Sequence, residues 1–516
     1  MNKKIISSVL LITVISSFGK ILGLIRESIL ALHFGASGST DAFKIAFSIP
    51  DIFIAIFSAA IAQTFIPVYS DYIKAGNKRK TQNFLNSVFT SISIVSIAIV
   101  VIGIIASRMI VNIIAPGFDG ETKQAAALMT SIMFPGAIFM ILANLSSAYL
   151  QAHEKYFSSS LMWYSYNICI ILGLAVFKGY GIKVAAYGAA LGFVGMLLIQ
   201  LPSMLKQGFK FRPVIDFKNE GYLKIRQLVV PVLISSAFNQ VYLIINRILG
   251  SNLSAGSISA LDYAGRVGIL VNTIIVVSIV NVIYPRLAKL ESSPEKFRLL
   301  FSRTMWLISV IMLPLVSLMF IFRGQIIYIL FQRGAFTGKD TEITAAILGF
   351  LSLSIVGIAY REILNRAFFS LKDTRTPMIN GIITILINIA LNLIFIGFMG
   401  VYGLALGTSA ASVISALMLF LRLRKKLGHI NGRAIAGGFA KAVLASTGMS
   451  VFVYLLKSEM FHMEGSTLAV LLKVVLMTAA GFAVYMGILL LLNADRLKAA
   501  RGGIFFKGKE IINRRG

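Results

Sequence analysis

Two long apolar runs between residues 20 and 67 contain charged residues of both signs and are joined by the short turn GASGST. The charged residues are Lys20, Arg26, Glu27, Asp41, Lys44 and Asp51. A charge near the centre of a membrane-spanning helix costs at least about 2.5–3.5 kcal/mol unless it faces water or a partner. Six charges in two adjacent spans therefore predict an internal polar cavity.

Two later apolar segments add further cations at similar positions. The predicted cationic pocket consists of Lys20, Arg26, Arg247 and Arg266. Because the planar guanidinium bonds phosphate oxygens in pairs, this pocket would suit an anionic headgroup. The alternative is that Lys20–Glu27 and Asp262–Arg266 are internal ion pairs and that the remaining cations extend to the interface. The excess of cations over anions favours an anionic substrate.

The local helix geometry gives two further expectations for these spans. Lys20 and Glu27 are seven residues apart and share a helix face, whereas Arg26 joins that face only if Gly19 and Gly23 bend or unwind the helix. Pro50 removes a backbone donor and is expected to break the second span. A broken helix would line the cavity with polar backbone groups.

A second charged group lies within a later span, nearer the end that we assign to the cytoplasm. Arg361 and Glu362, with Arg366, are predicted to form a structural or gating ion-pair cluster. Cys169 is the single cysteine, and the four histidines have no ligand spacing. No disulfide and no metal site is therefore expected.

Composition identifies the class of protein that must position these charges. The chain has 516 residues, of which 57% are hydrophobic and 13% charged, and its mean hydropathy is +0.84. A soluble protein would have about 25% charged residues. Apolar blocks of membrane-spanning length indicate an all-α polytopic membrane protein. The net charge of +29 fits basic loops beside anionic lipid, and no nucleic-acid partner is expected.

Fourteen membrane-spanning helices are predicted from the apolar blocks. Their approximate limits are 7–32, 41–70, 83–107, 124–152, 158–178, 184–205, 223–250, 257–285, 300–325, 341–370, 377–397, 402–422, 434–456 and 467–492. Lys and Arg gather in alternate loops and in the C-terminal tail after residue 495. By the positive-inside rule, both termini are expected to lie in the cytoplasm. The protein is expected in the bacterial cytoplasmic membrane.

An internal repeat relates the two halves of the chain. The segment 38–67 aligns with 256–285 at an offset of 218 residues, and later segments align at similar offsets. The repeat predicts two six-helix lobes related by a pseudo-two-fold axis along the membrane normal, with two additional C-terminal helices. The predicted domains are 1–215, 216–430 and 431–516, the last including a basic cytoplasmic tail. Such repeats are typical of alternating-access transporters, and a channel or a structural scaffold is the alternative.

Catalytic and nucleotide-binding motifs are absent from the sequence. There is no phosphate-cradling GxxxxGK[ST] loop, no nucleophile elbow and no HExxH. We therefore expect a transporter that is not an enzyme and has no cofactor. Its driving force would be an ion gradient such as that of a monovalent cation, the membrane potential, or consumption of substrate on one side.

With these residues in view, the chain resembles the MurJ (MviN) family of bacterial lipid II flippases, within the multidrug/oligosaccharidyl-lipid/polysaccharide exporter superfamily. The matching stretches are ILGLIRE (21–27), FGASGSTDAF (34–43), TFIPVYS (64–70), APGF (115–118), GSISALDYAGR (256–266), LFQRGAFT (330–337) and RAFFSLKDTRTP (366–377). The resemblance implies translocation of lipid II from the inner to the outer leaflet for peptidoglycan synthesis, with membrane lipids and other cell-wall synthesis proteins as partners. It also implies a groove between the last two spans for the polyprenyl tail.

The resemblance further implies that the essential basic residues of the cavity fall on Lys20, Arg26 and Arg266, and that an acidic residue of the second span falls on Asp41. Two departures from the family pattern stand out: the stretch IAIFSAA (54–60) is uncharged, and Gly265 replaces an acidic residue. They leave open a flippase for another polyprenyl-linked oligosaccharide. A cation-coupled multidrug antiporter is the third reading, although it predicts an acidic cavity and twelve spans.

Overall fold

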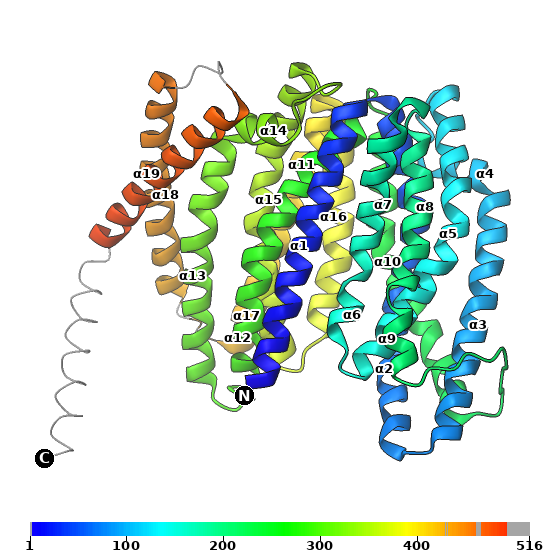
Figure 1. The fold of residues 1–516 in the computed structure, drawn as a ribbon. Helices are drawn as coiled ribbons and strands as arrows, with labels where there is room; N and C mark the ends of the chain where they lie inside the picture. The colour runs from blue at the N-terminus through cyan, green and yellow to red at the C-terminus, as the bar shows by residue number, and fades with distance from the viewer. Residues whose placement is uncertain (1–2, 429, 431, 461–465, 493–516) are drawn as a thin grey trace, which may run out of the picture. The chain divides into compact units, whose positions relative to one another are not determined.

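The computed structural model describes residues 3–428, 430, 432–460 and 466–492, and these residues form helices joined by short connections (Figure 1). No β-strand occurs among the described residues. The predicted basic tail after residue 492 lies outside them. In chain order the α-helices are α1 (Lys3–Phe34), α2 (Gly38–Ala75), α3 (Lys78–Ile105), α4 (Ser107–Ile114), α5 (Gly120–Ala152), α6 (Tyr156–Ser160), α7 (Met162–Phe177), α8 (Lys183–Leu198), α9 (Leu201–Lys206), α10 (Glu220–Ser251), α11 (Ser257–Val271), α12 (Ser278–Ala288), α13 (Pro294–Ile321), α14 (Arg323–Phe331), α15 (Gly338–Ser370), α16 (Arg375–Met399), α17 (Val401–Leu427), α18 (Gly432–Met460) and α19 (Thr467–Leu492).

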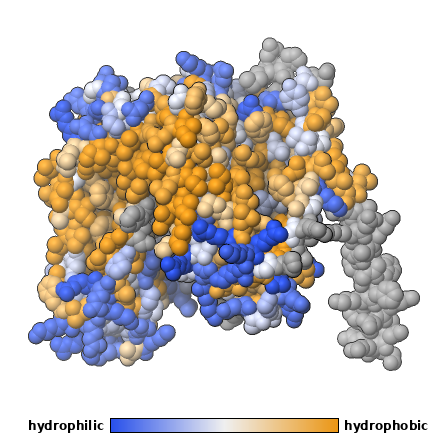
Figure 2. All heavy atoms as spheres, turned by 180° about the vertical axis from the view of Figure 1, so that it is seen from behind, coloured by the Kyte–Doolittle hydropathy of each residue, from blue (hydrophilic) through white to orange (hydrophobic). Residues whose placement is uncertain are grey.

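Twelve helical segments of the described residues are long and apolar enough to cross a membrane. The 32-residue helices α1 and α10 are not among these twelve, so the predicted count of fourteen is not confirmed. One of the twelve, Ser257–Ala288, joins α11 and α12 through a π-helical segment, η2 (Asn272–Val277). On the visible surface, hydrophobic residues form a broad band, and hydrophilic residues gather mainly along the upper edge and in the lower part of the view (Figure 2). The predicted all-α polytopic membrane class is confirmed.

The expected helix break at Pro50 is wrong, and the unwinding considered at Gly19 and Gly23 does not occur. The second span is one uninterrupted helix, α2, with both Pro50 and Pro67 inside it. A proline removes only its own N–H donor, and packing against a neighbouring helix holds the rest of the helix in place, here α5. Helix α1 likewise runs through Gly19 and Gly23 without unwinding.

The chain divides into two compact units, each with its own helix packing. Unit 1 takes the described residues within Met1–Arg266, Phe331–Asp340 and Met399–Leu404, and unit 2 those within Val267–Leu330, Thr341–Phe398 and Ala405–Gly516. In unit 1, α5 packs between α2 and α8, and α8 also packs on α7. In unit 2, α18 packs between α13 and α19. The division into lobes 1–215, 216–430 and 431–516 concerns the sequence repeat and stays a prediction.

Helices α7 and α8 approach so closely that only glycine fits between them. A Cβ atom on Gly192 would lie 2.6 Å from Cα of Tyr166, and one on Gly188 would lie 2.9 Å from Cα of Ile170. Phe193 stacks on the Tyr166 ring at a centroid distance of 5.6 Å. The small-residue spacing in α8 therefore fixes the position of Tyr166.

Replacing Gly192 by alanine is expected to destabilise the fold by about 1–3 kcal/mol, because the added methyl group forces α7 and α8 apart. The midpoint of thermal unfolding of the purified chain in detergent measures this effect. The control is Gly397→Ala in α16, where a Cβ would have no neighbour within 4 Å. Equal midpoints for the two variants would contradict the close contact.

Candidate functional site

Four helices of unit 1 bring six charged side chains together. This charged cluster consists of Arg26 and Glu27 on α1, Lys44 on α2, Arg247 on α10, and Asp262 and Arg266 on α11. Consecutive helical residues project about 100° apart, so Arg26 and Glu27 face different neighbours of α1. Arg26 is 4% exposed and Glu27 is fully buried, so both positions are enclosed by the surrounding helices.

Glu27 is the centre of the cluster because its single carboxylate serves three cations. Arg26 donates to its Oε1 and Lys44 donates to its Oε2. The guanidinium Nε of Arg266 lies 3.7 Å from Oε1. The carboxylate thus links α1, α2 and α11, and each of the three cations shares it with the other two.

Asp262 forms the second ion pair of the cluster and has one partner. Both of its oxygens accept hydrogen bonds of 3.1 Å from the two terminal nitrogens of Arg247, which is the bidentate geometry. Both side chains are 21% exposed. Arg247 is therefore neutralised locally, unlike the other three cations.

The ion pairs differ from the two that the sequence spacing suggested. Glu27 pairs with Arg26, Lys44 and Arg266 rather than Lys20, and Asp262 pairs with Arg247 rather than Arg266. Spacing within one helix predicts only contacts along that helix. The observed pairs mostly join different helices, and the exception, Arg26–Glu27, joins adjacent residues.

Two tyrosine rings complete the surroundings of the buried cations. The Arg26 guanidinium lies 4.7 Å from the centroid of the Tyr166 ring, and the Lys44 ammonium lies 5.1 Å from that of Tyr263. An aromatic face attracts a cation without neutralising it. Sequence reasoning missed both tyrosines, because nothing in the spacing of aromatic residues separates them from other apolar positions.

Asp41 binds the start of α11 and takes no part in the cluster's ion pairs. Its Oδ2 accepts a hydrogen bond of 2.7 Å from the backbone N–H of Gly256. Its Oδ1 accepts one of 2.7 Å from the backbone N–H of Ser259 and another from the Ser259 hydroxyl. A carboxylate at a helix N-terminus satisfies unpaired donors and complements the helix dipole. Asp41 and Ser259 are 218 residues apart, which is the offset of the sequence repeat.

The remaining predicted residues take no part in these ion pairs, although the carboxylate of Asp51 interacts electrostatically with Arg26, Arg247 and Arg266. Lys20 and Asp51 are partly exposed and form no ion pair among the described residues. Arg361 and Glu362, on α15, also form none, so the predicted ion-pair cluster there is absent. The Arg366 guanidinium instead lies 5.4 Å from the Tyr284 ring centroid. Roles in binding or gating stay predictions for all of these residues, as does the internal cavity.

The charged cluster has a net positive charge with one accessible cation. In the ion pairs themselves, four cations share two carboxylates, and the carboxylate of Asp51 interacts electrostatically with Arg26, Arg247 and Arg266 without pairing with any of them. The Arg266 side chain is 41% exposed, the most open of the four. No group of His, Cys, Asp and Glu in the described part of the chain has the arrangement of a metal site. The arrangement suits reversible binding of an anion.

Sequence comparison places the chain among known membrane proteins. A family model described as lipid II flippase MurJ matches residues 30–476. The "Probable lipid II flippase MurJ" of Buchnera aphidicola subsp. Schizaphis graminum is 33% identical over 435 residues, covering 83% of this chain and 84% of the relative. The protein of the same description in Vibrio cholerae is 28% identical over 447 residues, covering 84% of each chain.

Solved structures give the same grouping. "Lipid II flippase MurJ, inward closed conformation" superposes with a TM-score of 0.80 at 27% identity, covering 95% of this chain and 100% of that chain. An inward-facing multidrug resistance MATE family transporter superposes with a TM-score of 0.69 at 15% identity, covering 80% of this chain and 96% of that chain. The second likeness concerns the fold alone.

Replacing Glu27 by glutamine removes the one carboxylate that three cations share. We expect the unfolding midpoint to fall, by an amount equivalent to about 3–5 kcal/mol, because buried cations are left uncompensated. Replacing Lys44 by methionine in the same chain should recover part of this loss. Asp71→Asn is the control, since Asp71 is exposed near the end of α2 and has no ion pair among the described residues. If Glu27→Gln and Asp71→Asn unfold at the same temperature, the central position assigned to Glu27 is wrong.

Proposed function

Because this chain belongs to the lipid II flippase MurJ family, we propose that it moves lipid II, the lipid-linked precursor of peptidoglycan, from the inner to the outer leaflet of the cytoplasmic membrane. It does so by alternating access. It is a transporter of the inner membrane with many spans, and lipid II and membrane lipids are its partners. Other cell-wall synthesis proteins are proposed as further partners.

The observation that carries this proposal is the cation surplus of the charged cluster. A diphosphate that joins a lipid to a sugar has one negative charge on each phosphate, which is opposite in sign to the cations that share the Glu27 carboxylate. Arginine guanidinium groups bond such oxygens in pairs. The anionic headgroup of lipid II is therefore a chemical match for the side chains that this unit encloses.

We assign each residue of the cluster a role in headgroup binding. Arg266 is the first contact, since it is the most exposed and is the most weakly held, at 3.7 Å from Glu27. Arg26 supports the bound diphosphate from its place against Tyr166. Arg247 positions Asp262, and Lys44 holds the Glu27 carboxylate in place. Lys20 and Asp51 extend the same region along α1 and α2.

Asp41 holds α11 in place, and with it Arg266. Its hydrogen bonds to Gly256 and Ser259 fix the start of the helix that presents Asp262 and Arg266. We propose that breaking this contact accompanies the change of access, and that Arg361 and Glu362 act at a gate in unit 2.

The proposed energy source is the membrane potential or a monovalent cation, with no cofactor. Lys and Arg are concentrated in alternate loops and in the C-terminal tail. Loops rich in Lys and Arg face the cytoplasm, so both termini are proposed to lie there.

One departure from the family pattern favours a second substrate. The stretch 54–60 of α2 is uncharged, so contacts to the sugar or peptide of the headgroup would differ from those of relatives with charges there. A flippase for another polyprenyl-linked oligosaccharide would keep the diphosphate contacts of Arg26 and Arg266. A multidrug antiporter is disfavoured, since a net positive cluster repels cationic drugs.

Expression of the chain in a bacterium depleted of its own lipid II flippase tests the substrate. We expect growth to be restored and lipid II to leave the inner leaflet. If growth is not restored and lipid II stays in the inner leaflet despite normal membrane levels of the chain, lipid II is not the substrate. Parallel assays with another undecaprenyl diphosphate oligosaccharide test the second candidate.

The variants Arg26→Ala and Arg266→Ala test the binding cluster in the same strain. Both are expected to abolish rescue without loss of the protein from the membrane, because each removes one charge of the surplus. Arg79→Ala is the control, since Arg79 is exposed at the start of α3. Wild-type growth with either cluster variant would remove the residue from the proposed site.

A further inference from the structure

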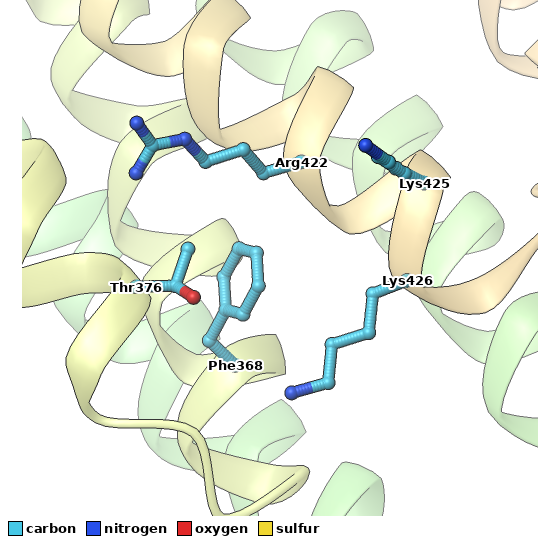
Figure 3. A pocket seen from close by; sticks show the side chains of 5 residues that line it. All are labelled: Phe368, Thr376, Arg422, Lys425 and Lys426. Atoms are coloured by element: carbon cyan, nitrogen blue, oxygen red, sulfur yellow. The ribbon is translucent and has the colours of Figure 1, made fainter.

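A second positively charged site lies in unit 2, where α15 ends, α16 begins and α17 ends. A cavity of about 220 Å³ is lined there by Phe368, Thr376, Arg422, Lys425 and Lys426. Arg422 and Lys426 extend from α17 on either side of the Phe368 ring (Figure 3). The ends of three membrane-spanning segments meet at this point, so the cavity lies at the boundary between hydrocarbon and water.

The loop between α15 and α16 gives the cavity a fixed wall. Asp373 accepts hydrogen bonds of 2.9 Å from the backbone N–H and from the hydroxyl of Thr376, at the start of α16. Lys426 donates a hydrogen bond of 2.6 Å to the same carboxylate from the end of α17. Phe368 is 1% exposed and forms an apolar floor.

Asp373 remains ionised throughout the physiological range. Burial alone would raise the pKa of its carboxyl group, but the hydrogen bonds from Lys426 and Thr376 outweigh burial and hold the pKa at about 2. The negative charge of Asp373 is thus already paired with Lys426 and with the donors at the start of α16.

Two cations of the cavity are left without an acidic partner. Neither Arg422 nor Lys425 forms an ion pair with any carboxylate of the described residues. Lys425 also lines an adjoining cavity of about 440 Å³, together with Leu421, Arg424 and Gly428. The two cavities, which share Lys425 in their linings, therefore have a net positive charge.

The volume of the cavity and its position at the membrane interface indicate which kind of ligand it can bind. Pockets for whole small molecules are typically about 300–1,000 Å³, so the 220 Å³ cavity suits one charged group rather than an entire lipid. Cations in the interfacial region attract the anionic phosphates of lipids there. The adjoining cavity leaves room for the group that the phosphate carries.

We propose that the cavity lined by Phe368, Thr376, Arg422, Lys425 and Lys426 binds the phosphate-ester headgroup of a membrane lipid. The site is separate from the charged cluster and shares no residue with it. Arg422 and Lys425 bind the phosphate oxygens, and Lys426 holds the wall through Asp373. The phosphate belongs either to an anionic phospholipid of the leaflet or to a polyprenyl diphosphate.

Binding to the full-length protein, measured by native mass spectrometry, tests the site with three probes: phosphatidylglycerol, zwitterionic phosphatidylcholine and undecaprenyl diphosphate. The test variant is R422Q/K425Q, which leaves the Lys426–Asp373 pair intact. The matched control is K78Q/R79Q, which removes the same two charges from an exposed helix start. Undecaprenyl diphosphate is also measured in an Arg266→Ala background, so that loss at the charged cluster is counted separately.

The dissociation constant of an anionic probe is expected to rise by about tenfold in R422Q/K425Q and to change little in K78Q/R79Q. A higher dissociation constant for phosphatidylglycerol in R422Q/K425Q identifies a phospholipid site. A higher dissociation constant for undecaprenyl diphosphate alone identifies a polyprenyl diphosphate site. Both outcomes support phosphate-ester binding, and neither depends on whether the chain moves lipid II. Unchanged binding of both anionic probes, or equal loss in the control pair, would overturn the proposal.

Discussion

The carboxylate of Glu27 is the group on which the charged cluster depends. A buried carboxylate is stable only when cations and hydrogen bonds replace its water, and here Arg26 and Lys44 do so directly. Arg266 adds a weaker contact from α11. Since the three cations lie on three helices, this one charge fixes their relative positions within unit 1. The same sharing leaves positive charge uncompensated, which is what an anionic ligand needs.

The second constraint is the close approach of the turns that start α2 and α11. Gly256 has φ +89°, and a Cβ there would lie 2.2 Å from the carbonyl oxygen of Ala36. Only glycine permits this conformation together with this contact. Asp41 then reaches the N–H groups of Gly256 and Ser259. Positions 41 and 259 are equivalent in the repeat, yet one is acidic and the other is serine, so duplication has produced an asymmetric link.

The sequence was informative about the class of fold and about which charges are enclosed. Cost arguments for charges in apolar helices selected six residues, of which Arg26, Glu27, Lys44 and Asp41 are buried, whereas Lys20 and Asp51 are partly exposed. The same arguments failed at Pro50, because packing against α5 preserves the helix despite the missing donor. Ion-pair partners were also mispredicted, since they depend on which helices are neighbours, and periodicity does not contain that information. The cavity beside Asp373 was missed for the same reason.

Sharing one carboxylate among several cations also has a consequence for release. In the proposed function a headgroup must leave as readily as it arrives, so each cation must keep a favourable contact when the cluster is empty. When an anion departs, Arg266 has Glu27 within 3.7 Å to return to, and Arg26 and Lys44 keep their direct contacts and their tyrosine faces. The difference in free energy between occupied and empty states is thereby kept small. A separate carboxylate for every cation would weaken anion binding, and loss of Glu27 would strengthen it and slow release.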